Sequence, residues 1–261
     1  MTTSLKMPSS TLKLAQLNNE PEIFHSIQGE GVNIGVPSIF VRASLCNLHC
    51  RWCDTDYTWN WQNTPWEHEN DQLTGYEKFN KQDYIVELDT NEVVERISAY
   101  PCKNVIFTGG EPLLQDKAWQ AVTTGLMSKD RSYHIEVETN GTITPSSALD
   151  KHISQYNVSP KLENSGNQRD LRIQSKALEF FAHSSKSWFK FVVSHVNDLN
   201  EIEDILSAHD IPRERTLLMP EGRDSSTLAK RRQWLAEICR DQGFRLSDRL
   251  HIQLWGSKRG V

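Results

Sequence analysis

The chain has 261 residues, 37% of them hydrophobic, with 29 Lys and Arg against 34 Asp and Glu and a formal net charge of −5. That length suffices for one large α/β domain or two small ones, and the acidic balance disfavours a permanent nucleic-acid surface, because phosphate binding needs a concentrated positive field. No apolar run approaches the roughly 20 residues of a membrane-spanning helix, and the first residues lack the apolar stretch of a secretory signal, so we expect a cytoplasmic protein without membrane contact.

Residues 1–20 are polar and aperiodic, so we expect a flexible N-terminal leader before a single domain over residues 21–261. From Glu22 onward, runs rich in β-branched and aromatic residues alternate with amphipathic stretches. The predicted strands are 38–43, 104–108, 134–139, 156–159, 188–193, 216–219 and 250–255. The predicted helices are 91–100, 116–127, 171–182, 198–208 and 226–241.

The repeated order of strand and helix predicts an α/β fold with a parallel sheet and right-handed crossovers. About six such units predict an incomplete βα barrel. In closed barrels the catalytic groups lie at the C-terminal ends of the strands, and we expect the same placement here.

Three cysteines, Cys46, Cys50 and Cys53, directly follow the first predicted strand with the spacing Cys-x3-Cys-x2-Cys. Three thiolates on a tight loop can ligate three irons of a cubic 4Fe-4S cluster and leave the fourth iron open. A structural zinc site needs four ligands, and His49 and Cys102 are poorly placed as the fourth. An odd number of cysteines and no secretory signal disfavour a disulfide framework. An iron–sulfur loop is therefore the preferred interpretation.

Residues 56–89, behind this loop, are aromatic and polar and show no repeat. We interpret them as an insertion after the cluster loop. Such a segment either covers the cluster, extends a subunit interface, or is an ordinary loop packed on the domain.

The segment Thr108-Gly109-Gly110-Glu111-Pro112 follows the apolar run 105–107. Two glycines at a strand end let a backbone approach a ligand closely, and Pro112 is well suited to begin a helix. Alone, the pattern is typical of a plain strand-to-helix turn. Behind the three-cysteine loop, it resembles the radical S-adenosylmethionine superfamily.

That resemblance implies that S-adenosyl-L-methionine chelates the open iron and is cleaved by one electron to a 5′-deoxyadenosyl radical. It implies that Cys46, Cys50 and Cys53 ligate the cluster and that Gly109 lies along the cofactor. No catalytic side chain is expected beyond those that position cofactor and substrate. The residues implied to contact S-adenosylmethionine are Trp52, Cys53, Asp54, Gly110, Glu111, Ser159 and Lys161.

The segment 22–31, before the first predicted strand, carries two glycines, Gln28 and Glu30. Amide and carboxylate groups can pair with the donor–acceptor edge of a pterin or purine, although a glycine-rich lead-in loop is the plainer reading. Together with Phe40-Val41-Arg42, the cysteine loop and 54–57, it closely resembles the 7-carboxy-7-deazaguanine synthases. The resemblance implies a lyase of 7-deazapurine and queuosine-precursor biosynthesis, which converts 6-carboxy-5,6,7,8-tetrahydropterin to 7-carboxy-7-deazaguanine and releases ammonia.

By the same resemblance, Arg42 pairs with the substrate carboxylate, although a structural ion pair is the alternative. Thr55 matches a magnesium ligand, with substrate oxygens and water completing the coordination. The family also suggests a homodimer and a flavodoxin-type electron donor. The residues 138–140 either help on the same rim or only form a turn. The residues implied to contact substrate are Ile27, Gln28, Gly29, Arg42 and Thr108.

Three other interpretations stay open at this point. One is a tRNA-modifying radical enzyme, which the acidic net charge and the lack of an appended nucleic-acid module disfavour. A glycyl-radical-enzyme activase shares the Cys-x3-Cys-x2-Cys loop, but it acts on a macromolecule and has no need of Gln28, Glu30 and Arg42. A non-catalytic zinc-binding adaptor would hold one zinc in place of about four irons.

Overall fold

Seven parallel strands form the centre of the fold, in a computed structural model that describes residues 10–261. The sheet order is β11-β10-β9-β8-β7-β6-β4-β1-β2, with β3 added on β4 and β5 on β1. The strands are β1 Thr11–Leu17, β2 Glu20–Pro21, β3 Ile23–Ile27, β4 Pro37–Ala43, β5 Ile85–Asp89, β6 Asn104–Gly109, β7 His134–Thr139, β8 Gln155–Val158, β9 Ser187–Val193, β10 Thr216–Pro220 and β11 Arg245–Leu246. The helices are α1 Thr90–Ser98, α2 Asp116–Lys129, α3 Ser147–Asp150, α4 Arg169–Arg172, α5 Ser175–His183, α6 Asp198–Ala208, α7 Ser225–Gln242 and α8 Leu250–Trp255.

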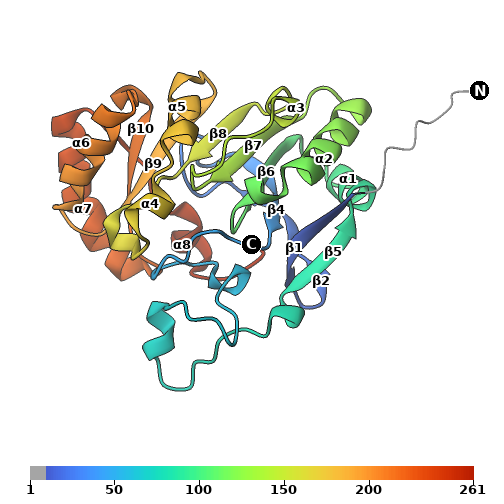
Figure 1. Cartoon of the computed structure of the whole chain (residues 1–261), viewed down its shortest axis with the longest axis horizontal. Helices are drawn as coiled ribbons and strands as arrows, with labels where there is room; N and C mark the ends of the chain where they lie inside the picture. The colour runs from blue at the N-terminus through green and yellow to red at the C-terminus, as the bar shows by residue number, and fades with distance from the viewer. Residues whose placement is uncertain (1–9) are drawn as a thin grey trace, which may run out of the picture.

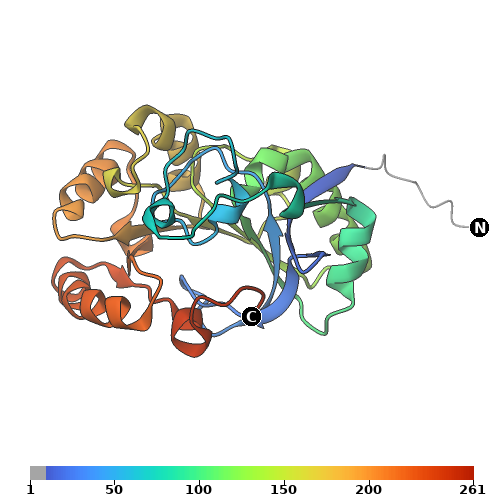
Figure 2. The ribbon, with the colours of Figure 1, turned by 90° about the horizontal axis from the view of Figure 1, so that it is seen from below.

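The predicted incomplete βα barrel is confirmed. Strands β4 and β6 to β11 pair in parallel, and β11 contributes only two residues to this series. Within residues 10–261 the strand order runs from β11 to β2 without closing. Helices α1, α2 and α5 to α7 lie along the outside of the curved sheet, and the C-terminal segment runs past the blue N-terminal strands (Figures 1 and 2).

The core lies between the sheet and the outer helices. Residues Val105 and Phe107 of β6 are fully buried, and the Phe107 ring stacks on Trp119 of α2 with centroids 4.0 Å apart. The residues of β6 that alternate with Val105 and Phe107 face the inside of the barrel, because successive side chains of a strand point to opposite faces of the sheet. Among residues 10–261, no helix combines the length and the apolar composition that a bilayer span requires.

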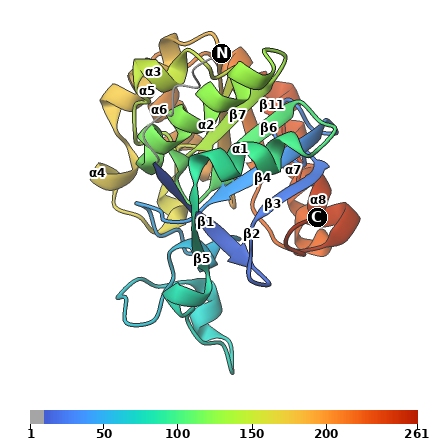
Figure 3. The ribbon, with the colours of Figure 1, turned by 90° about the vertical axis from the view of Figure 1, so that its right-hand side faces the viewer.

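The predicted leader is wrong for the residues that the structure describes, and residues 1–9 lie outside them. Residues Thr11–Leu17 form β1, which pairs with β5 and carries the fully buried Leu12 and Leu14 (Figure 3). The sequence Thr-Leu-Lys-Leu has the period-2 pattern of a half-buried strand, which the polar residues around it obscure.

The predicted strand over 250–255 is also wrong, because these residues form α8. Its Leu250 N–H donates to the Gly29 carbonyl at 2.8 Å, so the backbone leaves the sheet at this point and turns toward the segment before β4. The predicted helix over 171–182 is divided into α4 and α5 by two extended residues. The break turns Arg172 inward, where it donates to the carbonyls of Asn167 and Lys161 at 3.1 and 2.9 Å.

Residues 56–84 contain three short 3-10 helices and project below the sheet, whereas 85–89 return to it as β5 (Figure 1). The segment has an interior of its own. The Phe79 ring packs edge-on against Tyr84 at 4.6 Å, and Tyr76 donates to Asp56 at 2.9 Å.

Candidate active site

A cavity of about 660 Å³ lies at the C-terminal ends of the parallel strands. It is walled by the cysteine loop, the segment before β4, the turns after β6, β7 and β8, and the end of the chain. The sequence-predicted residues that line it are Ile27, Gln28, Gly29, Arg42, Cys46, Cys50, Trp52, Cys53, Asp54, Thr55, Thr108, Gly110, Ser159 and Lys161. All the predicted site residues except Glu111 therefore line the same cavity.

The side chain of Glu111 is fully buried outside the cavity lining. Its carboxylate accepts hydrogen bonds from the Thr139 hydroxyl at 2.9 Å and from the N–H groups of Asn140 and Leu113 at 2.7 and 2.9 Å. Burial raises the pKa of this carboxyl group despite those donors. Glu111 therefore connects the turn after β6 to the end of β7 through hydrogen bonds within the chain, and its contact with S-adenosylmethionine stays a prediction.

The cysteine loop begins with a conformation that is unusual for its residue type. Leu45 has a φ of +76°, in the left-handed region that few non-glycine residues adopt. Two backbone hydrogen bonds hold it, because its N–H donates to Thr58 at 3.1 Å and its carbonyl accepts from Glu111 at 2.8 Å. The chain thus turns sharply after β4 and presents Cys46 to the cavity.

Donors from elsewhere in the chain reach the sulfur atoms. The side-chain amide of Asn167 donates to Cys50 Sγ at 3.3 Å, and the Leu48 N–H donates to Cys46 Sγ at 3.5 Å. The Asn167 oxygen also accepts from the His49 N–H at 2.8 Å. Hydrogen bonds to sulfur are a regular feature of iron–sulfur sites, where they tune the reduction potential. The loop therefore fits a cluster in both its ligands and its surroundings.

The spacing of the three thiols disfavours a single ion. Sulfur ligands about 2.3 Å from one zinc ion would lie about 3.8 Å apart in a tetrahedral site. Among the described residues, the three cysteine sulfurs are not all within 4.8 Å of one another. Burial raises the pKa of all three thiols in the metal-free chain, so metal binding must displace their protons.

The two glycines at the end of β6 are required by the close approach of this turn to the cysteine loop. A Cβ on Gly109, whose φ is +129°, would lie 2.1 Å from the Ala43 carbonyl oxygen. A Cβ on Gly110 would lie 2.1 Å from the Leu45 carbonyl oxygen and 3.1 Å from Cys46 Cβ. The glycine turn and the cysteine loop are thus packed backbone against backbone, with both glycines on the cavity wall.

The aromatic residue before the third cysteine is anchored from the opposite wall. The Trp52 indole N–H donates to the Asn164 carbonyl at 3.1 Å, and Lys161 Nζ lies 5.9 Å from the centre of the ring. Lys161 also donates to the Ser159 hydroxyl at 2.8 Å. These three predicted cofactor residues form one continuous surface beside the cysteines.

On the other side of the cavity, a carboxylate on β7 joins two of the predicted substrate residues. Glu138 accepts from the Gln28 side-chain amide at 3.0 Å and from the Thr108 hydroxyl at 2.6 Å. This cluster offers an acceptor and several donors on one wall, which is what recognition of a heterocycle requires. Glu138, Thr139 and Asn140 all line the cavity, as the rim position predicted for them requires.

Arg42 stands beside a carboxylate that a second arginine also contacts. Its Nε lies 3.2 Å from Glu22 without an aligned hydrogen bond, and Arg259 lies 2.9 Å from the same carboxylate. Arg259 stacks 3.4 Å above the Tyr57 ring. Burial would lower the pKa of Arg42, but Tyr57, Glu22 and other acidic groups raise it, so the guanidinium keeps its charge.

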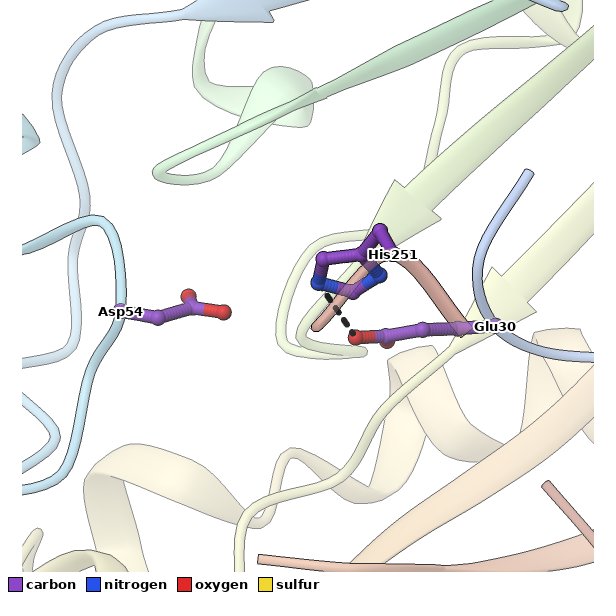
Figure 4. Close-up of side chains that lie close together, drawn as sticks. All are labelled: Glu30, Asp54 and His251. Atoms are coloured by element: carbon purple, nitrogen blue, oxygen red, sulfur yellow. Dashed lines mark ion pairs between the residues drawn. The ribbon is translucent and has the colours of Figure 1, made fainter. Parts of the chain in front are cut away.

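A second group of charges lies between the cysteine loop and the segment before β4, and it also lines the cavity. Glu30 pairs with Lys190 of β9 and with Arg249, and Arg249 also pairs with Asp54. Figure 4 shows that Glu30 and Asp54 approach each other from two loops, with His251 beside them. Glu30, Asp54 and His251 lie close enough to hold a metal ion. The two cations balance the two carboxylates, so this group is better described as an ion-pair cluster.

Thr55, the predicted magnesium ligand, lines the cavity next to the third cysteine, with its hydroxyl 3.5 Å from Cys53 Sγ. From the C-terminal part of the chain, His251 and Val261 line the cavity and Gln253 does not.

Sequence reasoning missed Glu22, Lys190, Arg249 and Arg259 as site residues. Each pairs with a residue far away in the sequence, and an isolated charged residue carries no local motif. The only signal was the charged chain end, where basic residues gather at 258–259.

Residues 41–156, from β4 to β8, match the model of the Radical SAM superfamily. The three-cysteine loop and the parallel sheet agree with that match, so the chain is a radical S-adenosylmethionine enzyme with a 4Fe-4S cluster. The 7-carboxy-7-deazaguanine synthase of Pyrobaculum aerophilum is 38% identical, over 92% of this chain and 95% of the relative. That of Halobacterium salinarum is 34% identical, over 90% of this chain and 89% of the relative.

The crystal structure of QueE from Escherichia coli superposes with a TM-score of 0.65 at 26% identity, over 92% of this chain and 95% of that chain. The chain belongs to the 7-carboxy-7-deazaguanine synthase family. This membership favours neither the glycyl-radical-enzyme activase nor the zinc adaptor.

Proposed function

We propose that this enzyme converts 6-carboxy-5,6,7,8-tetrahydropterin to 7-carboxy-7-deazaguanine with release of ammonia. The observation that carries the proposal is one cavity that combines the three cysteines with a polar wall suited to a carboxylated heterocycle. The names of the two relatives, which this chain matches over 95% and 89% of their lengths, support the same reaction.

The polar wall supplies the recognition. Gln28 and Thr108 are held by Glu138, which fixes the direction of their remaining donors and acceptors toward the cavity. Arg42, with no aligned hydrogen bond from its Nε, offers its planar fork to the substrate carboxylate.

The opposite wall holds the cofactor. The Cys46, Cys50 and Cys53 thiolates bind the cluster, and Trp52, Asp54, Gly110, Ser159 and Lys161 form the surface for S-adenosylmethionine. When bound, the cluster and S-adenosylmethionine would supply the one-electron chemistry. The chain itself contributes by orienting the pterin against the cofactor, and such positioning is the usual contribution of a protein to cofactor chemistry.

Magnesium, the oligomeric state and the electron donor are further parts of this proposal. Thr55 offers one hydroxyl to Mg²⁺, and the substrate carboxylate and water complete the coordination, which suits an ion that keeps several waters. The active form is a homodimer, and a flavodoxin-type protein supplies the electron.

Anaerobic reconstitution followed by turnover tests the reaction. Purified enzyme with iron and sulfide, S-adenosylmethionine and a reductant is supplied with the tetrahydropterin, with and without Mg²⁺, and the product and ammonia are measured. We expect about four irons per chain, product formation, and a higher rate with Mg²⁺. A chain that binds one zinc, or that cleaves S-adenosylmethionine without converting the pterin, would refute the proposal.

A further inference from the structure

We infer that Arg249 is a positioning residue that couples binding of the pterin to binding of S-adenosylmethionine, because it joins the loop that carries Glu30 to the loop that carries Asp54. The inference rests on the proposed function, since it assigns the two loops to those two ligands. It adds a residue that neither the cysteine motif nor the glycine motif includes.

The Arg249 side chain uses all three of its nitrogens. Nε donates to Glu30 at 2.9 Å, one terminal nitrogen donates to the Gly222 carbonyl at 2.6 Å, and the other pairs with Asp54. The residue is 6% exposed. A planar guanidinium whose three nitrogens each bind a different acceptor is held in one orientation, so it fixes the distance between the two carboxylates.

The first loop, 28–31, is the pterin side. Hydrogen bonds on both sides of Glu30 join this loop to the residues around Arg249. The Gly29 carbonyl accepts from the Leu250 N–H at 2.8 Å, and the Gly31 N–H donates to the Ser247 hydroxyl at 2.8 Å. The loop then reaches the substrate wall, because the Gln28 oxygen accepts from the Glu30 N–H at 3.1 Å. A shift of Glu30 is thus transmitted to Gln28.

The second loop is the cofactor side. Asp54 directly follows the cluster ligand Cys53 and lines the cavity. Figure 4 shows its carboxylate extending away from its own loop toward Glu30 and His251. The Asp54 side chain is 44% exposed, so Arg249 is the main contact that restrains it.

Lys190 does not provide a second link between Glu30 and Asp54. It pairs with Glu30 but has no contact with Asp54 among the described residues. Removing the Arg249 charge therefore leaves Glu30 paired with Lys190 and takes away the one ion pair that Asp54 makes within residues 10–261. Since one residue orders both loops, ordering by the first ligand lowers the cost of ordering for the second, which is positive coupling.

The experiment measures that coupling in the reconstituted holoenzyme with its cluster oxidised, so that no turnover occurs. The dissociation constant of S-adenosylmethionine is determined by anaerobic calorimetry with and without saturating 6-carboxytetrahydropterin. We expect the pterin to tighten binding about fivefold or more in the unaltered enzyme, at the lower end of typical allosteric coupling. Arg249→Met should bring the ratio close to one, with the iron content unchanged.

Two further variants separate coupling from stability. Arg249→Lys keeps the charge but cannot reach both carboxylates, so it should restore folding and only part of the coupling; if Arg249→Met does not fold, this variant decides. Arg232→Met is the matched control. Arg232 pairs at 3.2 Å with Asp248, the residue before Arg249 in the sequence, and neither Arg232 nor Asp248 lines the cavity. It should keep the full ratio.

An unaltered enzyme that converts the pterin but shows no coupling, or an Arg249→Lys variant with the full ratio, would overturn the role of Arg249 alone. An unaltered enzyme that fails to convert the pterin would overturn the proposed function, and the inference with it. Turnover of the unaltered enzyme therefore distinguishes the two failures.

Discussion

Arg42 and Arg259 share a single carboxylate, that of Glu22, at 3.2 and 2.9 Å. Within residues 10–261, Glu22 is the one carboxylate at ion-pair distance from these two guanidinium groups. The carboxylate of a substrate would add a second acidic partner for them. The ion pair with Glu22 therefore agrees with both sequence interpretations of Arg42, because it orients the side chain and does not preclude that second partner.

Arg42→Ala should raise the KM for the pterin roughly tenfold or more, since hydrogen bonds to charged groups contribute about 1.5–3 kcal/mol. Glu22 keeps Arg259 as a partner in this variant, so the chain should still fold. Steady-state kinetics and iron analysis measure the two effects. A normal KM would show that the substrate carboxylate binds elsewhere.

Glu22→Gln should lower stability at neutral pH by about 1–3 kcal/mol, because it removes the buried counter-ion that two partly exposed arginines share. The pH dependence follows from the pKa. Burial alone would raise the pKa of Glu22, but Arg42 and Arg259 together hold it below its usual value of 4.5. The unfolded chain therefore binds the proton first as pH falls, and the stabilisation is present above about pH 4.5 and lost below it.

Urea unfolding between pH 7 and pH 3.5 measures this difference. The variant and the unaltered chain should converge as pH falls below 4.5. Glu20→Gln is the control, because Glu20 pairs with Arg96 on the surface and should contribute little. Parallel curves for Glu22→Gln and the unaltered chain would contradict the assignment.

The sequence was sufficient for those parts of the site that depend on neighbouring residues. The cysteines and the glycine turn are contiguous patterns, and the strand runs before them placed both at the same rim of the barrel. Contacts such as Arg249 with Glu30 and Arg259 with Glu22 were not predictable. They join residues 219 and 237 positions apart, and only the folded chain brings these residues together.

The errors in the predicted secondary structure have local causes. Leu250-His-Ile-Gln alternates apolar and polar residues as a strand does. The six residues of α8 are too few to distinguish the two-residue period of a strand from the 3.6-residue period of a helix. The short β1 was hidden by its polar neighbours. The position of Glu111 was missed for another reason, because a resemblance assigns a role to a sequence position without showing that the Glu111 carboxylate binds Thr139, Asn140 and Leu113.

Thr55→Ala should reduce the stimulation by Mg²⁺ and leave the rate without Mg²⁺ nearly unchanged. The hydroxyl is one ligand among several, so the ion should bind more weakly while cluster and substrate still bind. Rates over a Mg²⁺ titration give both values. Thr55→Ser, which keeps the hydroxyl, should respond to Mg²⁺ like the unaltered enzyme. A full response by Thr55→Ala would exclude this residue as a ligand.

Asn167→Asp should make the reduction potential of the cluster more negative. The substitution keeps the oxygen that accepts from His49 but replaces the amide that donates to Cys50 Sγ with a negative charge. Both changes disfavour an added electron. A potentiometric titration followed by electron paramagnetic resonance measures the shift, and Asn200→Asp on the exposed side of α6 is the control. An unchanged potential would show that this amide does not reach the cluster.

Gly110→Ala should prevent normal cluster assembly. The new Cβ would lie 2.1 Å from the Leu45 carbonyl oxygen, which is a backbone atom and cannot rotate away. The cysteine loop must then move, and iron content should fall well below that of the unaltered enzyme. Gly125→Ala is the matched control, because its Cβ would meet Val94 Cγ2 at 2.8 Å, a side-chain atom that can yield. The control should lose some stability, roughly 1–3 kcal/mol as for other overpacked sites, and keep its iron. Full iron content in Gly110→Ala would mean that the two turns can separate without disturbing the ligands.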